Sequence, residues 1–305
     1  MADILLTTLN ARYFHAAFGL RYLFANLGAL RSRARIVEFE INQRPVDIAE
    51  ALLDRNPKIL GVGVYIWNVA PALEVVATVK RVRPEVVVVL GGPEVSYELE
   101  SQPIAALADY IITGEADLEF ARLCAAILAG NRPPGRVIEA SPPEIASLVL
   151  PYELYSAEDI AHRIIYVEAS RGCPFHCEFC LSSLDIPVRQ AHLPAFLASL
   201  DGLLNRGARH LKFVDRTFNL NLGASRAILE FLLERYQPGL FFHFEMVPDR
   251  LPPELRDVIA RFPPGALQLE VGVQTFNPRA AALIQRRQNY ARKAELEKGR
   301  SVPRS

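Results

Sequence analysis

The chain has 305 residues, half of them hydrophobic, and its 34 basic residues balance its 34 acidic ones. This length favours two domains or one large α/β unit with a full core, and the zero net charge gives no general attraction to nucleic acid or anionic lipid. No signal peptide, membrane-length apolar run or secreted disulfide scaffold is evident, so we expect a cytoplasmic protein without nucleic-acid or membrane partners.

Strand and helix patterns alternate through residues 1–130. Apolar strands are predicted at 3–9, 34–40, 58–67, 85–92 and 109–114, and helices at 18–30, 46–55, 70–82 and 116–130. Continuously apolar strands separated by amphipathic helices are typical of a parallel sheet covered on both faces. We therefore predict an α/β, Rossmann-like (flavodoxin-like) domain whose ligand lies beyond the carboxyl ends of the strands.

A segment rich in Pro, Gly and Ser, residues 131–160, is predicted to be a linker. Beyond it, residues 161–305 resume the alternation. Strands are predicted at 163–170, 210–218, 240–247 and 267–275, and helices at 193–207, 223–236, 252–262 and from about Pro278. Four βα units in series predict a partial (β/α) barrel that carries its functional loops at the strand carboxyl ends.

Three of the four cysteines lie in one loop after the first strand of this second half. Cys173, Cys177 and Cys180 occur in the stretch "SRGCPFHCEFC". Three thiolates on a short loop can bind a compact iron–sulfur cluster and leave one iron open for a substrate or cofactor. Gly172 permits the tight turn before the first cysteine, and Pro174 stiffens the turn after it.

A small zinc knuckle is the alternative for this loop, with His176 or a distant histidine as the fourth ligand. The cluster is favoured because zinc motifs usually bring two pairs of ligands, and no second pair follows here. The remaining cysteine, Cys124, lies in a helix pattern among apolar neighbours and is predicted to be a core residue.

The spacing Cys-x3-Cys-x2-Cys after a first strand, with Phe179 just before the last cysteine, resembles the radical S-adenosylmethionine (SAM) superfamily. The resemblance implies a [4Fe–4S] cluster on the three cysteines, with SAM on the open iron. An electron from the cluster then splits SAM into methionine and a 5′-deoxyadenosyl radical, which abstracts hydrogen from substrate. It also implies a flavodoxin- or ferredoxin-type electron donor and a small-molecule substrate whose identity stays open.

Three later strand ends extend this resemblance. The segments "FVDRTFN", "FEMVPDRL" and "LEVGVQTFNP" are similar to the second-, third- and fourth-strand segments of the superfamily. The similarity implies SAM contacts at Phe179, Asp215, Glu245, Glu270 and Gln274, with Asp215 near the amino group and the last two near the ribose. Any one of these acids alone could be a solvated or capping residue, but three successive strand ends favour a site.

A full barrel of this superfamily has six βα units, whereas the basic, polar sequence after Gln288 contains no apolar strand run. The expectation is a truncated or frame-shifted chain, or one that a partner completes. An open parallel edge would then favour aggregation.

The first half resembles the cobalamin-binding domain that precedes the barrel in one large subgroup of radical SAM proteins, through "TTLNARYFHAAFGLRYLFANLG", "GVGVYIWN", "VVVVLGGPEVSYE" and "ITGEAD". His15 is not assigned to cobalt, because the Asp-x-His-x-x-Gly motif of the mutases is absent. The resemblance implies cobalamin contacts from the following residues: Tyr65, Trp67, Asn68, Gly91, Gly92, Pro93, Glu94, Gly114 and Glu115.

Three functions from different classes stay open at this stage. The favoured one is a cobalamin- and cluster-binding radical SAM enzyme that performs methyl transfer or rearrangement. A non-catalytic or truncated cobalamin- and iron–sulfur-binding protein is the alternative. A structural zinc protein comes third, because the loop lacks a fourth ligand.

Overall fold

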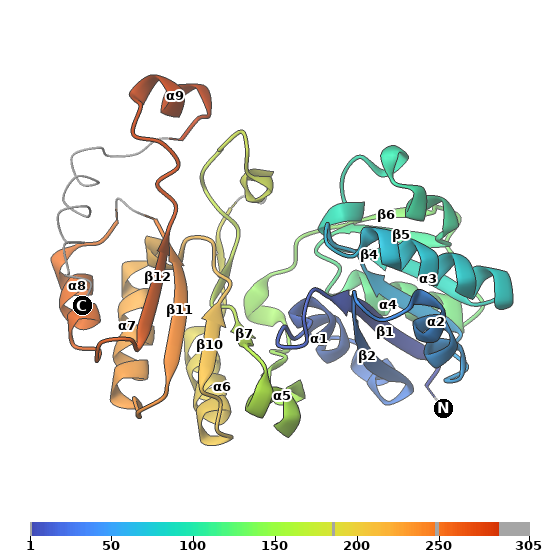
Figure 1. The fold of residues 1–305 in the computed structure, drawn as a ribbon, viewed down its shortest axis with the longest axis horizontal. Helices are drawn as coiled ribbons and strands as arrows, with labels where there is room; N and C mark the ends of the chain where they lie inside the picture. Colours follow the sequence, from blue (N-terminus) through green and yellow to red (C-terminus); the bar gives the residue numbers. More distant parts are fainter. Residues whose placement is uncertain (1, 185–186, 248–249, 287–305) are drawn as a thin grey trace. The chain divides into compact units, whose positions relative to one another are not determined.

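A computed structural model describes residues 2–184, 187–247 and 250–286. The chain forms two compact units, residues 1–163 and residues 164–305. Each unit contains its own parallel sheet (Figure 1).

The first unit is built on a six-stranded parallel sheet in the order β2-β1-β3-β4-β5-β6. Its first five strands follow the 2-1-3-4-5 order of flavodoxin-like folds, as the alternating pattern predicts. The strands are β1 (Ile4–Asn10), β2 (Ala34–Glu40), β3 (Ile59–Gly63), β4 (Val87–Gly91), β5 (Tyr110–Gly114) and β6 (Val137–Ala140).

Helices cover both faces of this sheet, which explains why its central strands are continuously apolar. Side chains of α2 (Pro45–Leu53) and α3 (Val69–Val82) join one buried cluster, and those of α1 (Phe18–Ala25) and α4 (Glu119–Leu128) join another. Cys124 is fully buried in the second cluster, and burial raises the pKa of its thiol to about 12. The prediction that Cys124 is a core residue is confirmed.

The segment expected to be a linker, 131–160, instead carries structure that belongs to the first unit. It contributes the edge strand β6 and the short helix α5 (Ala157–His162), and the unit continues to Arg163. Strand β6 alternates exposed and buried positions, so it lacks the continuous apolar run by which the other strands were predicted. Helix α1 also ends earlier than predicted, at Ala25, and a 3-10 turn from Gly28 follows it.

Four buried or half-buried charges connect the end of this segment to the start of the unit. Arg21 donates to Glu38 Oε1 (2.7 Å) and to Asp159 Oδ2 (2.9 Å), and Arg163 donates to Glu38 Oε2 (3.1 Å). Burial alone would raise the pKa of Asp159, but the Arg21 charge and a backbone hydrogen bond at Ser156 lower it below its usual value. Because Asp159 also closes a capping box with Ser156, helix α5 is fixed by the same contacts.

The second unit contains a four-stranded parallel sheet in the order β12-β11-β10-β7. Its strands are β7 (Ile165–Val167), β10 (His210–Phe213), β11 (Phe241–Met246) and β12 (Leu267–Val271), and its longer helices are α6 (Leu193–Asn205), α7 (Leu222–Glu234) and α8 (Pro253–Ala260). The four expected βα units are therefore present, and the fourth ends in α9 (Pro278–Leu283).

Aromatic side chains form the core of this second unit. Phe213, Phe242 and Phe244 are fully buried, and their rings pack on Phe196 of α6 and on Phe262 beyond α8. The helices lie along one face of the sheet (Figure 1). Closure of this open sheet into a barrel stays a prediction, and the sequence after Gln288 lies outside the described residues.

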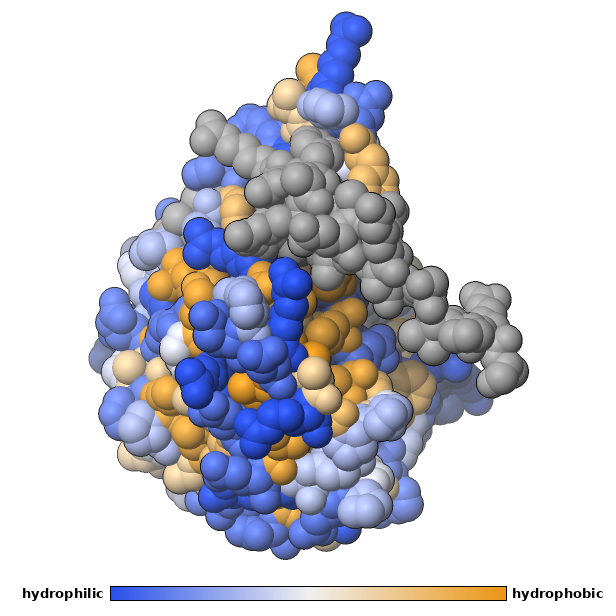
Figure 2. Space-filling view, turned by 90° about the vertical axis from the view of Figure 1, so that its left-hand side faces the viewer, coloured by the Kyte–Doolittle hydropathy of each residue, from blue (hydrophilic) through white to orange (hydrophobic). Residues whose placement is uncertain are grey.

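On the face that includes α7 and α8, hydrophilic and hydrophobic side chains are intermixed (Figure 2). Among the helices that the structure describes, none combines the length and apolar character needed to cross a membrane.

Candidate functional site

Exposed apolar side chains collect on the loops that follow the strands of the first sheet. Tyr13 and Phe14 follow β1, Ile66 and Trp67 follow β3, and Tyr97 follows β4; their exposed fractions range from 39% to 76%. The carboxyl ends of parallel strands lie at one edge of a sheet, so these loops share that edge. The edge therefore offers the unit's candidate binding surface for a large, flat and partly apolar ligand.

The buried side chain of Asn68 holds the loop after β3 in place through its hydrogen bonds. The rings of Tyr65 and Trp67 stack with centroids 4.6 Å apart and planes 6° apart. Asn68 is fully buried; its amide accepts from the Tyr65 backbone N (2.8 Å) and donates to the Leu9 carbonyl and the Thr8 hydroxyl (both 3.0 Å). The hydrogen bonds of the Asn68 side chain are therefore all made within the unit, and they position the loop that carries the two aromatic rings.

The structure explains why position 92 needs a glycine, which the sequence alone did not reveal. Its φ is +112°, and a Cβ at this position would lie 2.4 Å from the Val64 carbonyl oxygen. The same turn is fixed by the Val64 backbone N, which donates to the Gly91 carbonyl (2.8 Å). Gly92 is thus required by close packing of two loops of the unit, whereas a Cβ on Gly91 would meet its nearest atom at 3.6 Å.

The other predicted cobalamin contacts lie on the neighbouring turns. Pro93 and Glu94 begin a 3-10 turn after β4, and Glu94 accepts a hydrogen bond from Gln102 Nε2 (3.0 Å). Gly114 ends β5 with φ +75°, and its backbone N donates to Ser96 Oγ (3.3 Å). Glu115, directly after it, is half-buried.

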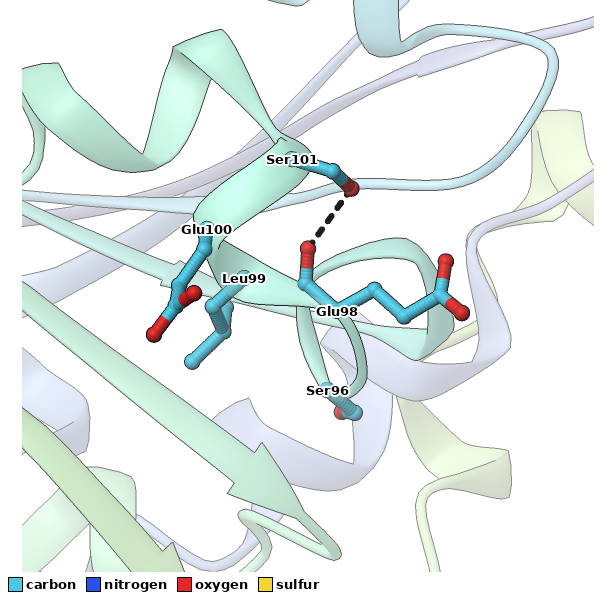
Figure 3. A pocket seen from close by; sticks show the side chains of 5 residues that line it. All are labelled: Ser96, Glu98, Leu99, Glu100 and Ser101. Carbon is cyan, nitrogen blue, oxygen red and sulfur yellow. Dashed lines mark hydrogen bonds between the residues drawn. The ribbon is translucent and has the colours of Figure 1, made fainter.

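An open hollow of about 520 Å³ lies in the connection between β4 and β5, and the sequence reasoning missed it. It is lined by Ser96, Glu98, Leu99, Glu100 and Ser101, and Ser101 Oγ donates to the Glu98 carbonyl (2.8 Å; Figure 3). The carboxylates of Glu98 and Glu100 extend in different directions (Figure 3), so they do not form a joint cation site. The hollow follows β4, so it lies at the same carboxyl edge of the sheet as the loops after β1 and β3.

His15 lies in the loop after β1, at this same edge. It is half-buried, and its ring centroid is 4.3 Å from that of Phe14. That it does not bind cobalt stays a prediction.

The cysteine loop of the second unit follows β7 and is closed at its base by a short antiparallel hairpin. The hairpin pairs β8 (Ser170–Arg171) with β9 (Arg189–Gln190). Cys173 and Cys177 are buried and Cys180 is half-buried, and the Cys180 backbone N donates to the Cys177 carbonyl (3.0 Å). The loop thus holds three thiols close to the strand end where the sequence predicted chemistry.

The thiol of Cys173 is influenced by the other two cysteines of the loop. Burial raises the pKa of Cys173; a backbone hydrogen bond at Phe175 opposes this, and the charges of Cys180 and Cys177 add to it. A bound cation reverses this tendency, because it stabilises the thiolate form that serves as ligand. Three thiols on one short loop are the donor set that iron–sulfur clusters use, so these residues fit such a group.

Within the described residues, no group of three or more His, Cys, Asp or Glu side chains is arranged to hold a single metal ion. A [4Fe–4S] cluster places each thiolate on a separate iron, so its ligands need not converge on one point. His176, the possible zinc ligand, is exposed on the loop.

Asp215 lies beneath the cysteine loop and is only 1% exposed. Its Oδ1 accepts from Ser170 Oγ (2.7 Å), and its Oδ2 accepts from the Ala169 backbone N (3.0 Å). Burial raises the pKa of Asp215 to about 6, against the opposing effect of these hydrogen bonds. In the structure Asp215 fixes the base of the loop, and its contact with the SAM amino group stays a prediction.

The acids at the ends of β11 and β12 have basic partners that sequence reasoning did not identify. Glu245 lies beside Glu270 in the strand register, and Arg216 is 3.5 Å from Glu245. Glu270 lies 3.0 Å from His243 Nε2 and 3.9 Å from Lys212 Nζ. The alternation of polar with buried aromatic residues in "HLKF" and "FFHFEM" is the signal that could have placed His243 and Lys212 on the Glu270 face.

Two further predicted SAM contacts lie on loops. Phe179 is 52% exposed on the cysteine loop. Gln274, which follows β12, is exposed and has a φ of +63°. These side chains are accessible, while their roles toward SAM stay predictions.

Comparison with known proteins supports both halves of this description. The family model of the B12 binding domain matches residues 4–124. The solved structure of the radical SAM methyltransferase TsrM from Kitasatospora setae, with cobalamin and a [4Fe–4S] cluster bound, superposes with a TM-score of 0.74 at 16% identity, over 99% of this chain and 66% of that one. The cobalamin-dependent SAM radical enzyme OxsB, with aqua-cobalamin bound, gives a TM-score of 0.73 at 14% identity, over 95% of this chain and 46% of that one.

A curated relative, an uncharacterised methyltransferase of Pyrococcus horikoshii, is 28% identical over 219 residues, which is 64% of this chain and 46% of the relative. The chain thus spans less than half of this relative and of OxsB, and about two thirds of TsrM. Residues 4–124 match the model of the B12 binding domain, and the chain shares the fold of the TsrM and OxsB structures. The resemblance inferred from the sequence is confirmed.

Proposed function

We propose that the protein is a cobalamin-dependent radical SAM enzyme that holds a [4Fe–4S] cluster on Cys173, Cys177 and Cys180. The observation that carries the proposal is a loop after β7 with three thiols in eight residues, in a chain whose first unit matches the B12 binding domain. When bound, the cluster supplies the electron for reductive cleavage of SAM.

The residues of the second unit have separate tasks in this proposal. Asp215 holds the base of the cysteine loop through Ser170, so the thiols stay at the strand end. Phe179, Glu245, Glu270 and Gln274 are the candidates for orienting SAM, which requires Glu270 to exchange its contact with His243 or share it.

Cobalamin is proposed to lie on the carboxyl edge of the first sheet. Trp67 and Tyr65 offer a rigid aromatic surface there, and the turns at Gly92 and Gly114 present backbone. Asn68 supports the aromatic pair from below. Gly91, Pro93, Glu94 and Glu115 complete the proposed contacts.

Methyl transfer is the favoured reaction class, because TsrM and the Pyrococcus relative are both named methyltransferases. The substrate is proposed to be a small molecule. A flavodoxin- or ferredoxin-type protein is the proposed electron donor, and a reducing cytoplasm is the compartment in which the thiols stay available.

Cluster binding is tested by anaerobic reconstitution with iron and sulfide. We expect about four irons per chain, loss of the cluster in Cys173→Ala, Cys177→Ala or Cys180→Ala, and formation of 5′-deoxyadenosine from SAM under dithionite. Cys124→Ala is the matched control and should keep its iron, because this thiol is buried in the other unit. Stoichiometric zinc without iron uptake would contradict the proposal.

Cobalamin binding is tested by titration while the fluorescence of Trp67, the chain's only tryptophan, is followed. Bound corrin should quench this emission, and the visible cobalt spectrum of His15→Ala should equal that of the unmodified protein. The affinity of Trp67→Ala is measured from the visible cobalamin spectrum, and an unaltered value would show that the corrin lies elsewhere. A changed cobalt spectrum in His15→Ala would reveal a cobalt ligand.

A further inference from the structure

The segment after α9 lies against the cysteine loop. The Glu178 backbone N donates to the Ile284 carbonyl (3.2 Å), and Gln285 Nε2 donates to the Glu178 carboxylate. Arg286 Nη1 lies 3.5 Å from Cys177 Sγ. These contacts join parts of the second unit that are more than a hundred residues apart, so the loop geometry depends on this segment.

The Arg286 guanidinium bridges two segments of the candidate site. Its Nη2 donates to the Gly272 carbonyl (2.9 Å), just beyond β12, while Nη1 faces the cysteine sulfur. Its carbon Cζ lies 5.9 Å from the centroid of the Phe175 ring, on the cysteine loop. Arg286 Nε is buried and has no hydrogen-bond partner among the described residues. The side chain therefore joins the cysteine loop to the end of the fourth strand.

The charge of this side chain has a defined effect on an adjacent cluster. Arginine stays protonated in proteins, so Arg286 places a permanent positive charge and an N–H donor beside the Cys177 sulfur. Hydrogen bonds to the ligand sulfurs and nearby charge are among the factors that set the reduction potential of an iron–sulfur cluster. Reduction adds one negative charge, so a fixed positive charge nearby stabilises the reduced form.

We propose that Arg286 is a positioning residue that raises the reduction potential of the cluster on the cysteine loop through its contact with Cys177. This inference rests on the proposed function, because it requires the cluster. It adds a residue outside the cysteine motif to the set that controls electron entry. The same contact sets the distance between the Cys177 sulfur and the Gly272 turn, which precedes Gln274.

The experiment is a redox titration of the reconstituted full chain, followed by electron paramagnetic resonance. A mediated one-electron reduction of the cluster is compared in the unmodified protein, Arg286→Gln and Arg286→Lys. Arg279→Gln is the matched control, because it removes the same charge from an exposed position on α9. Iron content is measured on every sample before titration.

We expect Arg286→Gln to load as much iron as the unmodified protein but to be about tenfold harder to reduce, which corresponds to about 59 mV more negative for a one-electron couple. Arg286→Lys, which keeps the charge, should lie between the two, and Arg279→Gln should match the unmodified protein. If Arg286→Gln loses its cluster while Arg286→Lys keeps it near the original potential, the requirement for the charge at Cys177 is supported.

Equal potentials in Arg286→Gln and the unmodified protein, both with full iron content, would overturn this inference and leave the proposed function standing. Loss of the cluster from both Arg286 variants would overturn it in favour of a purely structural role. Absence of iron in the unmodified protein itself would overturn the proposed function and this inference with it.

Discussion

The two units hold their candidate sites by different means. In the first unit every residue of β1 is buried, and the site lies on turns that follow such strands and are fixed by backbone contacts at Gly92 and by Asn68. In the second unit β12 alternates between half-buried and exposed residues, and the cysteine loop is held by a short hairpin and the side chains of Asp215 and Arg286. The first site therefore depends on the whole fold of its unit, and the second on a few side-chain contacts.

The largest expected effect concerns the buried charges of the first unit. Arg21→Ala removes the partner of Glu38 and Asp159, both nearly buried, and should lower the free energy of unfolding by about 3–5 kcal/mol. Trp67 fluorescence during denaturant unfolding reports this unit alone, because the chain has no other tryptophan.

The matched control for this test is Arg122→Ala, which breaks the exposed pair of Arg122 with Glu119 on α4 of the same unit and should change stability by about 0.5 kcal/mol or less. If Arg21→Ala lowers the free energy of unfolding by less than about 1 kcal/mol, the contrast drawn between the two units is wrong. It would mean that the first unit does not depend on contacts between its distant parts.

The next effect is a pH dependence at the base of the cysteine loop. Because burial raises the pKa of Asp215 to about 6, well above the usual value for an aspartate, the folded state binds a proton more tightly than the unfolded one. This stabilisation is complete below about pH 4 and is lost as the pH rises through about 6, by about 3 kcal/mol in all.

Amide hydrogen exchange of the peptide containing Ala169 and Ser170, corrected for intrinsic exchange, measures this loss between pH 4 and 7. In Asp215→Asn the pH dependence should vanish, because the amide does not ionise. In Asp201→Asn, which alters a half-buried acid on α6, it should persist. A flat profile in the unmodified protein would show that Asp215 does not govern the loop.

The smallest effect separates two glycines of the first unit that both have positive φ. Gly92→Ala meets the Val64 carbonyl, whereas Gly130→Ala, with φ +81°, meets nothing within 4 Å. Both substitutions carry a conformational cost of about 1 kcal/mol, and the close contact should add about 1–2 kcal/mol for Gly92→Ala only. Unfolding followed by Trp67 fluorescence measures the difference, and equal losses would show that the turn relaxes around a Cβ.

The sequence reasoning predicted the parts of the fold that depend on hydrophobic periodicity. Strands β1 to β5 and the four βα units of the second half were predicted because continuous apolar runs and helical spacing indicate them directly. The cysteine loop was recognisable from its local spacing. Its position after β7 follows from the order of the elements.

The features that were not predicted depend on contacts between distant residues, which no local sequence pattern reveals. Strand β6 is short and half-exposed, and α5 is stabilised by a capping box and by Arg21, far away in the sequence. Likewise Arg286 reaches Cys177 only through the tertiary fold. Gly92 was predicted to contact cobalamin, and this contact stays a prediction. The structure adds that the Val64 carbonyl leaves no room for a side chain at Gly92, which could not be known before the fold.

The distance in sequence between Cys177 and Arg286 has a consequence for biosynthesis. A ribosome adds about 5–20 residues per second, so the 109 positions that separate this cysteine from its arginine take roughly 5 to 20 s to translate. Throughout that interval the emerging thiols lack the guanidinium that later lies beside them. If the cysteines bind the proposed cluster, thiol reductants must keep them reduced during synthesis, because this contact of the folded protein does not yet exist.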